Sequence, residues 1–371
     1  MTAQEFKEFV RANGIKKAAK EVDIVTTGTF GAMCSSGAYL NFGHSDPPIK
    51  MQKIWIDGIP AQAGLAAVDA YIGATALDET NNMIHGGGHV IEDLVRGKAL
   101  RLRATSYGTD CYPRKEIDTY ISLRTINQAV LMNVRNCYQN YAVATNSSPK
   151  TMYTYMGKLL PEFGNATFSS AGEISPLMND PYYRTIGIGT RIFLGGGQGH
   201  VIWEGTQFNP GAPRTPNGVP KRPAGSLAVL GDLKQMTPDF LRGLTLSRYG
   251  STLGIGIGIP IPILDEEMAR YCAVTNDDIQ APVFDYGHQS RNRPVLRDVS
   301  YADLRSGEIT IKGKQVPTSS LSSLYKAKQI SEILKSWIMK GEFTIQEPIQ
   351  RFPMDRVLRN LDVRTEREAL Q

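Results

Sequence analysis

The spacing of apolar residues along the chain predicts short strands that alternate with helices. Phe6, Phe9 and Val10 recur at helical spacing, which predicts a helix over residues 3–20 with an interruption near Gly14. Short apolar or alternating runs predict strands at 22–26, 54–56, 99–105, 117–123 and 185–194. Small-residue and amphipathic runs predict further helices at 65–72, 90–95, 265–274 and 321–340, the last of which would cover a sheet.

Strands that alternate with helices indicate an α/β fold with a mixed or parallel sheet and glycine-rich loops after its strands. We expect one large catalytic domain over 1–371, within which 1–150 and 151–345 could be two halves of a duplication. The hint of duplication is that residues 86–92 and 196–202 both place Gly-His before Val-Ile. Two independent glycine-rich turns are the alternative, because glycine is the usual turn residue.

Two segments depart from ordinary periodicity. Residues 209–225 are rich in proline and glycine and have no periodic apolar positions, which indicates a mobile lid or a linker. Residues 254–262 alternate glycine with isoleucine, which predicts a strand with one face very close to a neighbouring backbone. The glycines of this run lack the G-x-G-x-x-G spacing and a following helix, so the run does not indicate a dinucleotide site.

Composition narrows the class of protein further. The 371 residues are 41% hydrophobic and 21% charged, which is typical of a soluble globular protein, and the formal net charge is +5. This mild positive charge favours a small anionic substrate and is too diffuse for nucleic acid. The N-terminus is polar and no apolar run is long enough to cross a bilayer, so a cytoplasmic location without membrane association is expected. Four cysteines without a C-x-x-C pair indicate neither a disulfide framework nor a local metal motif.

Cys34 lies in the stretch TTGTFGAMCSSGAYLNFG, residues 26–43, shortly after a predicted buried strand. Its small neighbours would leave the sulfur accessible and let the backbone approach a ligand. Cys111 also follows a predicted strand, so the two thiols could face each other across one pocket as catalytic residues. Basic Arg114 and Lys115 nearby would favour a thiolate, which is the nucleophile of covalent sulfur chemistry. The alternative is that both cysteines are buried packing residues.

Cys137 is a third thiol, between Asn136 and Tyr138 in a segment of mixed polarity. If Cys34, Cys111 and Cys137 converged, three thiolates would suffice to hold an iron–sulfur cluster with one open iron. The local spacings lack the ferredoxin pattern, so a cluster and a cofactor-free site both stay open.

Histidines supply further candidates for a pocket. His85 and His89 are spaced i, i+4, but the three glycines between them argue against the helix that a zinc pair needs. These two residues and His200, which occupies the equivalent place in the second Gly-His-Val-Ile sequence, are instead candidates for substrate binding or acid–base work.

Several long segments of the chain, in order, resemble the homocysteine-biosynthesis family, the L-aspartate semialdehyde sulfurtransferases found mainly in anaerobes. The resemblance spans roughly residues 3–355 and rests on VDIVTTGTFGAMCSSGAYLNFGHSDPPIKM, WIDGIPAQAGLAAVDAYIGAT, HGGGHVIEDLVRGK, YGTDCYPRKE and IGIGTRIFLGGGQGHVIWEGTQ. It implies an enzyme that places sulfur from sulfide or another donor on the aldehyde of L-aspartate semialdehyde. Reduction would then give L-homocysteine.

The resemblance also implies parts of the site. Cys34 and Cys111 match the functional cysteine pair of the family, and a ferredoxin-like iron–sulfur protein is the expected reducing partner. Arg114 or Arg191 would hold the substrate carboxylate by a bidentate contact, and backbone N–H groups of the glycine loops would stabilise an oxyanion. Many members carry paired CBS domains at the C-terminus, whereas this chain ends at Gln371, so we expect neither a CBS nor a ferredoxin domain. A homo-oligomer is expected.

Two other classes of function stay open from the residues alone. An acyl or CoA transferase with Glu173 or Glu204 as its catalytic carboxylate would tolerate loss of both cysteines. A non-catalytic iron–sulfur or sulfur carrier would bind its cargo but form no product from L-aspartate semialdehyde. Our hypothesis for the mechanism is that one cysteine, with Cys34 preferred to Cys111, holds or delivers sulfur as a persulfide or as cluster-bound sulfide. Cys111 would resolve or relay it, and the 209–225 loop would close over the reacting species.

Overall fold

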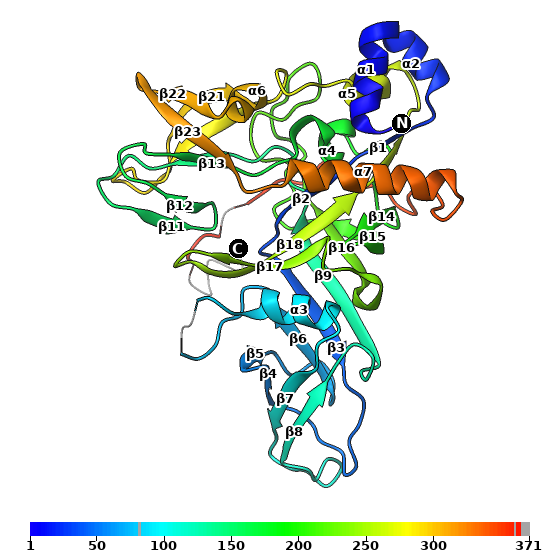
Figure 1. Ribbon diagram of the computed structural model, residues 1–371, viewed down its shortest axis with the longest axis vertical. Coiled ribbons are helices and arrows are strands. Elements are labelled where there is room, and N and C mark those ends of the chain that lie inside the picture. Colours follow the sequence, from blue (N-terminus) through cyan, green and yellow to red (C-terminus); the bar gives the residue numbers. More distant parts are fainter. Residues whose placement is uncertain (81–82, 360, 365–371) are drawn as a thin grey trace.

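The computed structural model describes residues 1–80, 83–359 and 361–364 and has a mixed α/β architecture of helices around several sheets (Figure 1). The predicted fold class is therefore confirmed. The sheets are mostly antiparallel, which is the arrangement that short connections between neighbouring strands allow.

The largest sheet runs through the middle of the molecule (Figure 1). Its strand order is β17 (Leu241–Leu246), β18 (Gly250–Gly258), β14 (Arg191–Leu194), β15 (Gly197–Glu204), β16 (Leu227–Asp232), β9 (Gln128–Asn136), β3 (Ser36–Asn41) and β6 (Asp69–Gly73). These neighbours pair antiparallel, and β2 (Thr29–Ala32) also pairs with β18. Strand β18 is buried along its whole length, because α3 (Gly87–Val95) covers one of its faces and α7 (Leu324–Met339) covers the other.

The alternation of glycine and isoleucine in β18 fits this two-sided burial. A Cβ atom at Gly256 or Gly258 would lie 2.7 Å from the Ile330 side chain of α7, so glycine lets the helix pack this close. Ile255 and Ile257 point to the opposite face and are fully buried. The strand does have one closely packed face. Its nearest neighbours there are mostly side chains and not a backbone as predicted, although a Cβ atom at Gly258 would also lie 2.9 Å from the Thr27 carbonyl oxygen.

The N-terminal helix is interrupted as predicted. α1 (Ala3–Asn13) begins with a capping box formed by Thr2 and Glu5, and α2 (Ile15–Glu21) follows at once. Gly14 joins the two helices with a φ of 82°, a conformation that favours glycine and ends the first helix.

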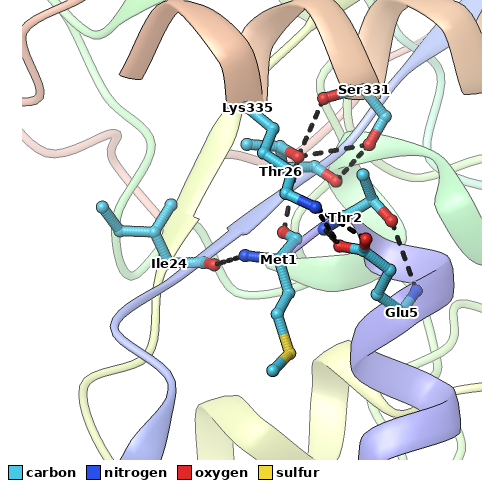
Figure 2. Close-up of polar contacts among 7 residues, drawn as sticks. All are labelled: Met1, Thr2, Glu5, Ile24, Thr26, Ser331 and Lys335. Carbon is cyan, nitrogen blue, oxygen red and sulfur yellow. Dashed lines mark hydrogen bonds and ion pairs between the residues drawn. The ribbon is translucent and has the colours of Figure 1, made fainter. Parts of the chain in front are cut away.

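The N-terminal segment also fastens α7 to the sheet, as Figure 2 shows. Glu5 of α1 pairs with Lys335 of α7 at 2.6 Å. Thr26, the last residue of β1 (Ile24–Thr26), donates from Oγ1 to the Ser331 carbonyl at 2.9 Å, and Ser331 Oγ donates to the Thr26 carbonyl at 2.6 Å. These contacts fix α7 across β2 and β18.

Two smaller sheets flank the large one. A mixed sheet has the order β21 (Val295–Ser300), β20 (Gln280–Asp285), β10 (Val143–Thr145), β13 (Ala166–Phe168), β23 (Lys314–Ser320) and β22 (Glu308–Ile311). Within it, β10 runs parallel to β20, and β13 runs parallel to β23. At the lower end of Figure 1 lies a sheet that we call the tip sheet, with the order β5 (Ile59–Ala61), β4 (Lys53–Ile56), β7 (Leu100–Thr105) and β8 (Glu116–Ile121).

The remaining elements are short. They are β11 (Met152–Thr154), β12 (Gly157–Leu159), β19 (Pro260–Pro262), α4 (Pro176–Asn179), α5 (Glu266–Cys272), α6 (Tyr301–Ser306), and the 3₁₀ turns η1 (Gly172–Ile174) and η2 (Leu233–Gln235). The helices predicted at 90–95, 265–274 and 321–340 are confirmed as α3, α5 and α7. None of the helices in the described ranges is both long and apolar enough to cross a membrane.

The helix predicted over 65–72 is wrong. Residues 69–73 form β6, which pairs with β3. Ala70 and Ile72 are fully buried and alternate with half-buried Tyr71, which is the period-2 pattern of a strand. The small residues before them suggested a closely packed helix, but sheet pairing decides the conformation here.

The repeated Gly-His-Val-Ile sequence folds in two different ways. Residues 87–95 form a helix, whereas residues 197–204 form a strand. In the first copy, a Cβ atom at Gly87 would lie 1.8 Å from the Gly73 carbonyl oxygen, so the helix start is pressed against the sheet. The second copy follows a hairpin turn in which Gly196 has a φ of 102°. The repeated sequence therefore does not mark two equivalent halves.

Residues 209–225 are packed on the body of the protein, contrary to the predicted mobile lid or linker. Ala212 and Val219 are buried. The Arg214 guanidinium donates to Gln139 Oε1 at 3.0 Å. Buried apolar side chains and a part-buried arginine contact anchor this segment, although it contains no helix or strand in the structure.

Candidate active site

A cavity of about 350 Å³ lies where the large sheet meets the mixed sheet. This volume is typical of sites for small molecules. Most residues of its wall carry hydroxyl or thiol groups, namely Tyr138, Tyr141, Tyr155, Tyr249, Ser35, Ser169, Ser170, Ser175, Ser322, Thr29, Cys34 and Cys137. The other residues of the wall are Arg135, Ala32, Met33, Met156 and Leu321. None of the residues 209–225 lines it.

Cys34 occupies a tight turn between β2 and β3. The Ser36 N–H and Oγ both donate to the Met33 carbonyl, at 3.2 and 2.5 Å, which makes Cys34 and Ser35 the central residues of a β-turn. Asn133 of β9 is fully buried and donates from Nδ2 to Ser36 Oγ at 2.6 Å. A neighbouring strand therefore holds the turn in place.

The Cys34 side chain lines the cavity and is half-buried. Thr252 Oγ1 of β18 donates a hydrogen bond to its sulfur at 3.3 Å, which fixes the sulfur at the cavity wall. The N–H groups of Cys34 and Ser35 donate no hydrogen bond to any described residue, as is usual in the middle of a turn. Two free backbone donors beside an accessible thiol could together stabilise an oxyanion.

The glycines around Cys34 serve packing. A Cβ atom at Gly28 would lie 2.2 Å from the Ala327 carbonyl oxygen of α7, and one at Gly37 would lie 2.3 Å from the Tyr71 hydroxyl oxygen. We predicted that the backbone at these glycines approaches a ligand, but it approaches α7 and Tyr71 instead. Cys34 also follows β2 and not the strand predicted at 22–26.

Cys137 lies in the same cavity wall as Cys34. It follows β9 with a φ of 57°, which is uncommon for a residue with a side chain. Its exposed fraction is 4%, and burial raises the pKa of its thiol to about 12. At neutral pH it is therefore a neutral thiol, which is a poor nucleophile and a poor metal ligand.

Cys111 is not brought into this cavity. It is exposed, in the loop between β7 and β8, and Figure 1 shows that loop at the lower end of the molecule. Arg114 in the same loop donates to the carbonyls of Asp46 and Pro47, at 2.6 and 2.9 Å, so its guanidinium is used within the tip. The expectation that Cys34 and Cys111 face each other across one pocket is wrong for this structure, and a functional role for Cys111 stays a prediction.

His85 and His89 lie on the face of β18 opposite to Cys34. Their ring centroids are 5.3 Å apart at the start of α3. Ser251 Oγ lies 3.4 Å from His89 Nδ1, whereas the next residue, Thr252, contacts Cys34. Neighbouring side chains on a strand point to opposite faces, so β18 separates both histidines from the cavity. Burial lowers the pKa of His89, which leaves its ring neutral at neutral pH.

His200 and Arg191 face each other across the β14–β15 pair and do not line the cavity. Arg191 Nη1 lies 3.4 Å from Gln198 Oε1. Burial lowers the pKa of His200, and the charge of Arg191 adds to this. The predicted substrate-binding set, His85, His89, His200, Arg114 and Arg191, is therefore not assembled in one place.

The residues present do not fit an iron–sulfur cluster held by Cys34, Cys111 and Cys137. Within the described ranges, no three or more histidine, cysteine, aspartate or glutamate side chains are placed to hold a metal ion. Two of the three thiols share the cavity, but the third lies at the tip, and burial favours the protonated form of Cys137.

The carboxylates of the transferase alternative are engaged elsewhere. Glu173 Oε2 accepts the Asn276 N–H at 2.9 Å, and Glu204 pairs with Arg356 at 3.1 Å. Neither residue lines the cavity. The geometry therefore does not favour an acyl or CoA transferase.

Arg135 is a candidate that sequence reasoning missed. It is the one charged side chain among the described residues of the cavity wall. Its position depends on a β-bulge, because the register of β9 against β16 shifts between Asn133 and Asn136. Bulges re-aim side chains and are frequent beside active sites. The sequence offered only a weak signal, an arginine two residues before Cys137.

Tyrosine hydroxyls supply much of the polar wall. Tyr141 donates to the Tyr155 hydroxyl at 3.0 Å, and the hydroxyls of Tyr155 and Tyr286 are 2.8 Å apart. Burial raises the pKa of Tyr138, Tyr141 and Tyr286, so these phenols are protonated at neutral pH. Because no histidine, aspartate or glutamate of the described chain lines the cavity, hydroxyl and thiol groups are its available proton donors.

Comparisons with known proteins extend these observations. A family model described as homocysteine biosynthesis enzyme, sulfur-incorporation, matches residues 1–345. A Methanosarcina acetivorans protein named L-aspartate semialdehyde sulfurtransferase is 54% identical over 351 residues, which cover 95% of this chain and 68% of that protein. A protein of the same name from Methanocaldococcus jannaschii is 52% identical over 364 residues, which cover 94% of this chain and 69% of that protein. No solved structure matches the chain.

Proposed function

Since the chain belongs to the homocysteine biosynthesis family of sulfur-incorporating enzymes, we propose that it places sulfur on the aldehyde carbon of L-aspartate semialdehyde in the formation of L-homocysteine. The observation that carries the proposal is a half-buried Cys34 thiol, fixed in a β-turn at the wall of a cavity of about 350 Å³. The names of the two relatives support the choice of substrate.

We assign sulfur transfer to Cys34 because its surroundings suit a nucleophile better than those of the other cysteines. Its sulfur is accessible from the cavity and fixed by Thr252, whereas Cys137 is a buried neutral thiol. A donor persulfide or polysulfide first passes its outer sulfur to the Cys34 thiolate, and the donor thiol leaves, so no oxidant is consumed. In the proposed step, the terminal sulfur of the resulting Cys34 persulfide attacks the aldehyde carbon. A C–S bond forms as the C=O π bond opens, and the electron pair moves to oxygen.

The oxyanion formed in this step has two sources of stabilisation in the cavity. The N–H groups of Cys34 and Ser35 are free to donate to it, and a neighbouring tyrosine hydroxyl supplies a proton. The tyrosines suit this task because burial keeps them protonated. The glycine loops, which we expected to supply these N–H groups, are replaced in this role by the turn that carries the nucleophile.

The electron balance distinguishes two sources of sulfur. Sulfide and the aldehyde lose water to give a thioaldehyde, and two electrons with two protons then give the thiol of homocysteine. A persulfide sulfur is more oxidised by two electrons, so that route consumes four electrons and returns the Cys34 thiol. The reductant is external in both cases, and we propose a ferredoxin-like iron–sulfur protein for this role.

The test is an oxygen-free assay of L-homocysteine formed from L-aspartate semialdehyde, a sulfur donor and a reductant. We expect Cys34→Ser to lower the rate roughly a thousandfold or more, since the nucleophile is lost. Cys272→Ala is the matched control, because Cys272 is buried in the core away from the cavity. Full activity of Cys34→Ser would contradict the assignment, and a wild type that binds sulfur without forming product would identify a carrier.

A further inference from the structure

We infer that Arg135 recognises the carboxylate of the substrate and that the cavity selects small aldehydes bearing a carboxylate. The inference rests on the proposed function for the reaction at the aldehyde. Its own basis is the distribution of charge in the cavity wall, where Arg135 stands among neutral hydroxyl, thiol and apolar side chains.

No carboxylate of the described residues forms an ion pair with Arg135. Its Nε donates to Thr206 Oγ1 at 2.8 Å, which is a neutral partner. Arg135 is half-buried, and its described partners are neutral. A guanidinium in this position is suited to an anionic ligand, because its planar N–H groups match the two oxygens of a carboxylate.

The backbone places this arginine with several contacts. The β-bulge of β9 includes Arg135, and its N–H donates to Asn133 Oδ1 at 2.7 Å. The amide group of Asn133 also donates to Ser36 Oγ, so a single buried side chain supports both the Cys34 turn and the bulge. The contact with Thr206 fixes the far end of the side chain. The nucleophile and the positive charge are thus positioned by one shared network.

The chemistry of the proposed substrate matches this arrangement. L-Aspartate semialdehyde carries its carboxylate and its aldehyde at opposite ends of a four-carbon chain. Thr206 accepts from Nε of Arg135, and the guanidinium also contacts the neutral Tyr138 hydroxyl. A substrate carboxylate would take the remaining terminal N–H groups and compete only with this neutral partner. The wall offers neutral serine and tyrosine hydroxyls to the substrate ammonium group. A substrate held by its carboxylate leaves its aldehyde free to react in the same cavity, whose wall also carries Cys34.

The test combines a change in the enzyme with a change in the substrate. Wild type, Arg135→Gln and Arg135→Lys are assayed with L-aspartate semialdehyde and with 3-aminopropanal, which lacks the carboxylate. In the wild type we expect kcat/KM to favour L-aspartate semialdehyde roughly 10- to 150-fold, the range for a hydrogen bond to a charged group. In Arg135→Gln this preference falls to about one, mainly through KM, and Arg135→Lys retains part of it.

Arg242→Gln is the matched control, because Arg242 is a half-exposed residue of β17 outside the cavity wall. It should keep the wild-type preference, and thermal unfolding should show all variants folded. An unchanged preference in Arg135→Gln would overturn the inference. A second readout, calorimetric binding of L-homoserine, needs no reaction: binding lost in Arg135→Gln supports the carboxylate site even if the wild type forms no homocysteine, an outcome that would refute only the proposed function.

Discussion

Two thiols with similar local sequences have opposite surroundings in this protein. Cys34 and Cys111 both follow a strand in a loop with glycine, serine or threonine neighbours. Cys34 is held in a closed turn and contacts Thr252 from a strand more than two hundred residues away in the sequence. Cys111 is exposed in a hairpin loop whose Thr109 and Tyr112 exchange backbone hydrogen bonds.

The difference shows that the loop that carries a thiol forms only part of a cavity, and that distant segments must enclose the rest. β9, β18, the segment around η1 and the start of α7 surround Cys34, and none of them is near it in sequence. The tip sheet offers Cys111 no such enclosure. If Cys111 takes part in catalysis, it acts from outside this cavity, at a step such as delivery of sulfur or electrons.

The largest expected effect is in the reactivity of the four thiols. Iodoacetamide should label Cys111 first and Cys34 more slowly, whereas buried Cys137 and Cys272 should react roughly a thousandfold more slowly, because labelling them requires the structure to open. Mass spectrometry at timed intervals measures the four rates. Loss of sulfur transfer should follow the labelling of Cys34. Loss of sulfur transfer that follows the labelling of Cys111 would contradict the view that Cys34, and not Cys111, is the reactive thiol of the cavity.

Buried Lys7, which contacts Cys272, should make the free energy of unfolding depend on pH. Lys7 Nζ donates to the Cys272 carbonyl at 2.8 Å, and burial lowers the pKa of Lys7 from 10.5 to about 8. Between these values the unfolded chain binds more protons than the native protein, so this residue makes stability rise with pH across the window, by at most about 3 kcal/mol. Denaturant titrations should therefore show the free energy of unfolding of wild type rising relative to that of Lys7→Met between pH 8 and pH 10.5.

The exposed Lys16 provides the control for this prediction. Lys16→Met should show no such pH-dependent difference from wild type, because the Lys16 side chain is exposed and folding does not remove it from water. Buried Cys137, whose pKa is raised, opposes the trend above pH 9, but it does so equally in all variants. A constant difference between wild type and Lys7→Met at every pH would contradict the prediction.

An intermediate effect is expected from Asn133, which supports the turn of Cys34 and the bulge of Arg135. Asn133→Ala should lower kcat/KM roughly 10- to 100-fold, because each lost buried hydrogen bond costs about 1–3 kcal/mol. The labelling rate of Cys34 should change, and that of Cys111 should not. Asn127→Ala is the control, since Asn127 bonds Asn41 at 3.0 Å at the other end of the same strand pair. Equal losses in both variants would point to general loosening of the sheet.

The smallest effect concerns the tie between α1 and α7. The Glu5–Lys335 pair is partly exposed, at 42% and 33% of the side chains, so Lys335→Met should lower the free energy of unfolding by about 0.5 kcal/mol. Urea titration at low and high salt measures this, with the difference shrinking at high salt. A loss of several kcal/mol would show that α7 depends on this pair far more than its exposure indicates.

The sequence was most informative where structure is local. Helical spacing correctly predicted α1 with its break at Gly14, and the amphipathic run before Lys340 correctly predicted α7. The helix predicted for residues 65–72 was wrong because strand pairing with β3 overrides the local preference of these residues. The proline-rich 209–225 segment failed because its few apolar residues find buried positions that no periodicity reveals.

The candidate site was predictable only in part. The stretch around Cys34 stood out by its glycines, although these pack against α7 and Tyr71 and not against a ligand. Cys111 and the histidines carried equally good local signals but lie on other surfaces. Arg135 carried almost none, because a register shift between two strands is a property of the pair and not of either sequence.

The bulge in β9 means that the charge of the cavity wall depends on the length of this strand as well as on the identity of its residues. One extra residue in the strand interrupts its ladder with β16 and re-aims Arg135. Removing that residue would restore a regular ladder and turn the following side chains to the other face. The protein would gain regular pairing and lose its cationic wall in a single event. Changes of length in this strand, more than changes of identity, are therefore where variants with a differently charged cavity should be sought.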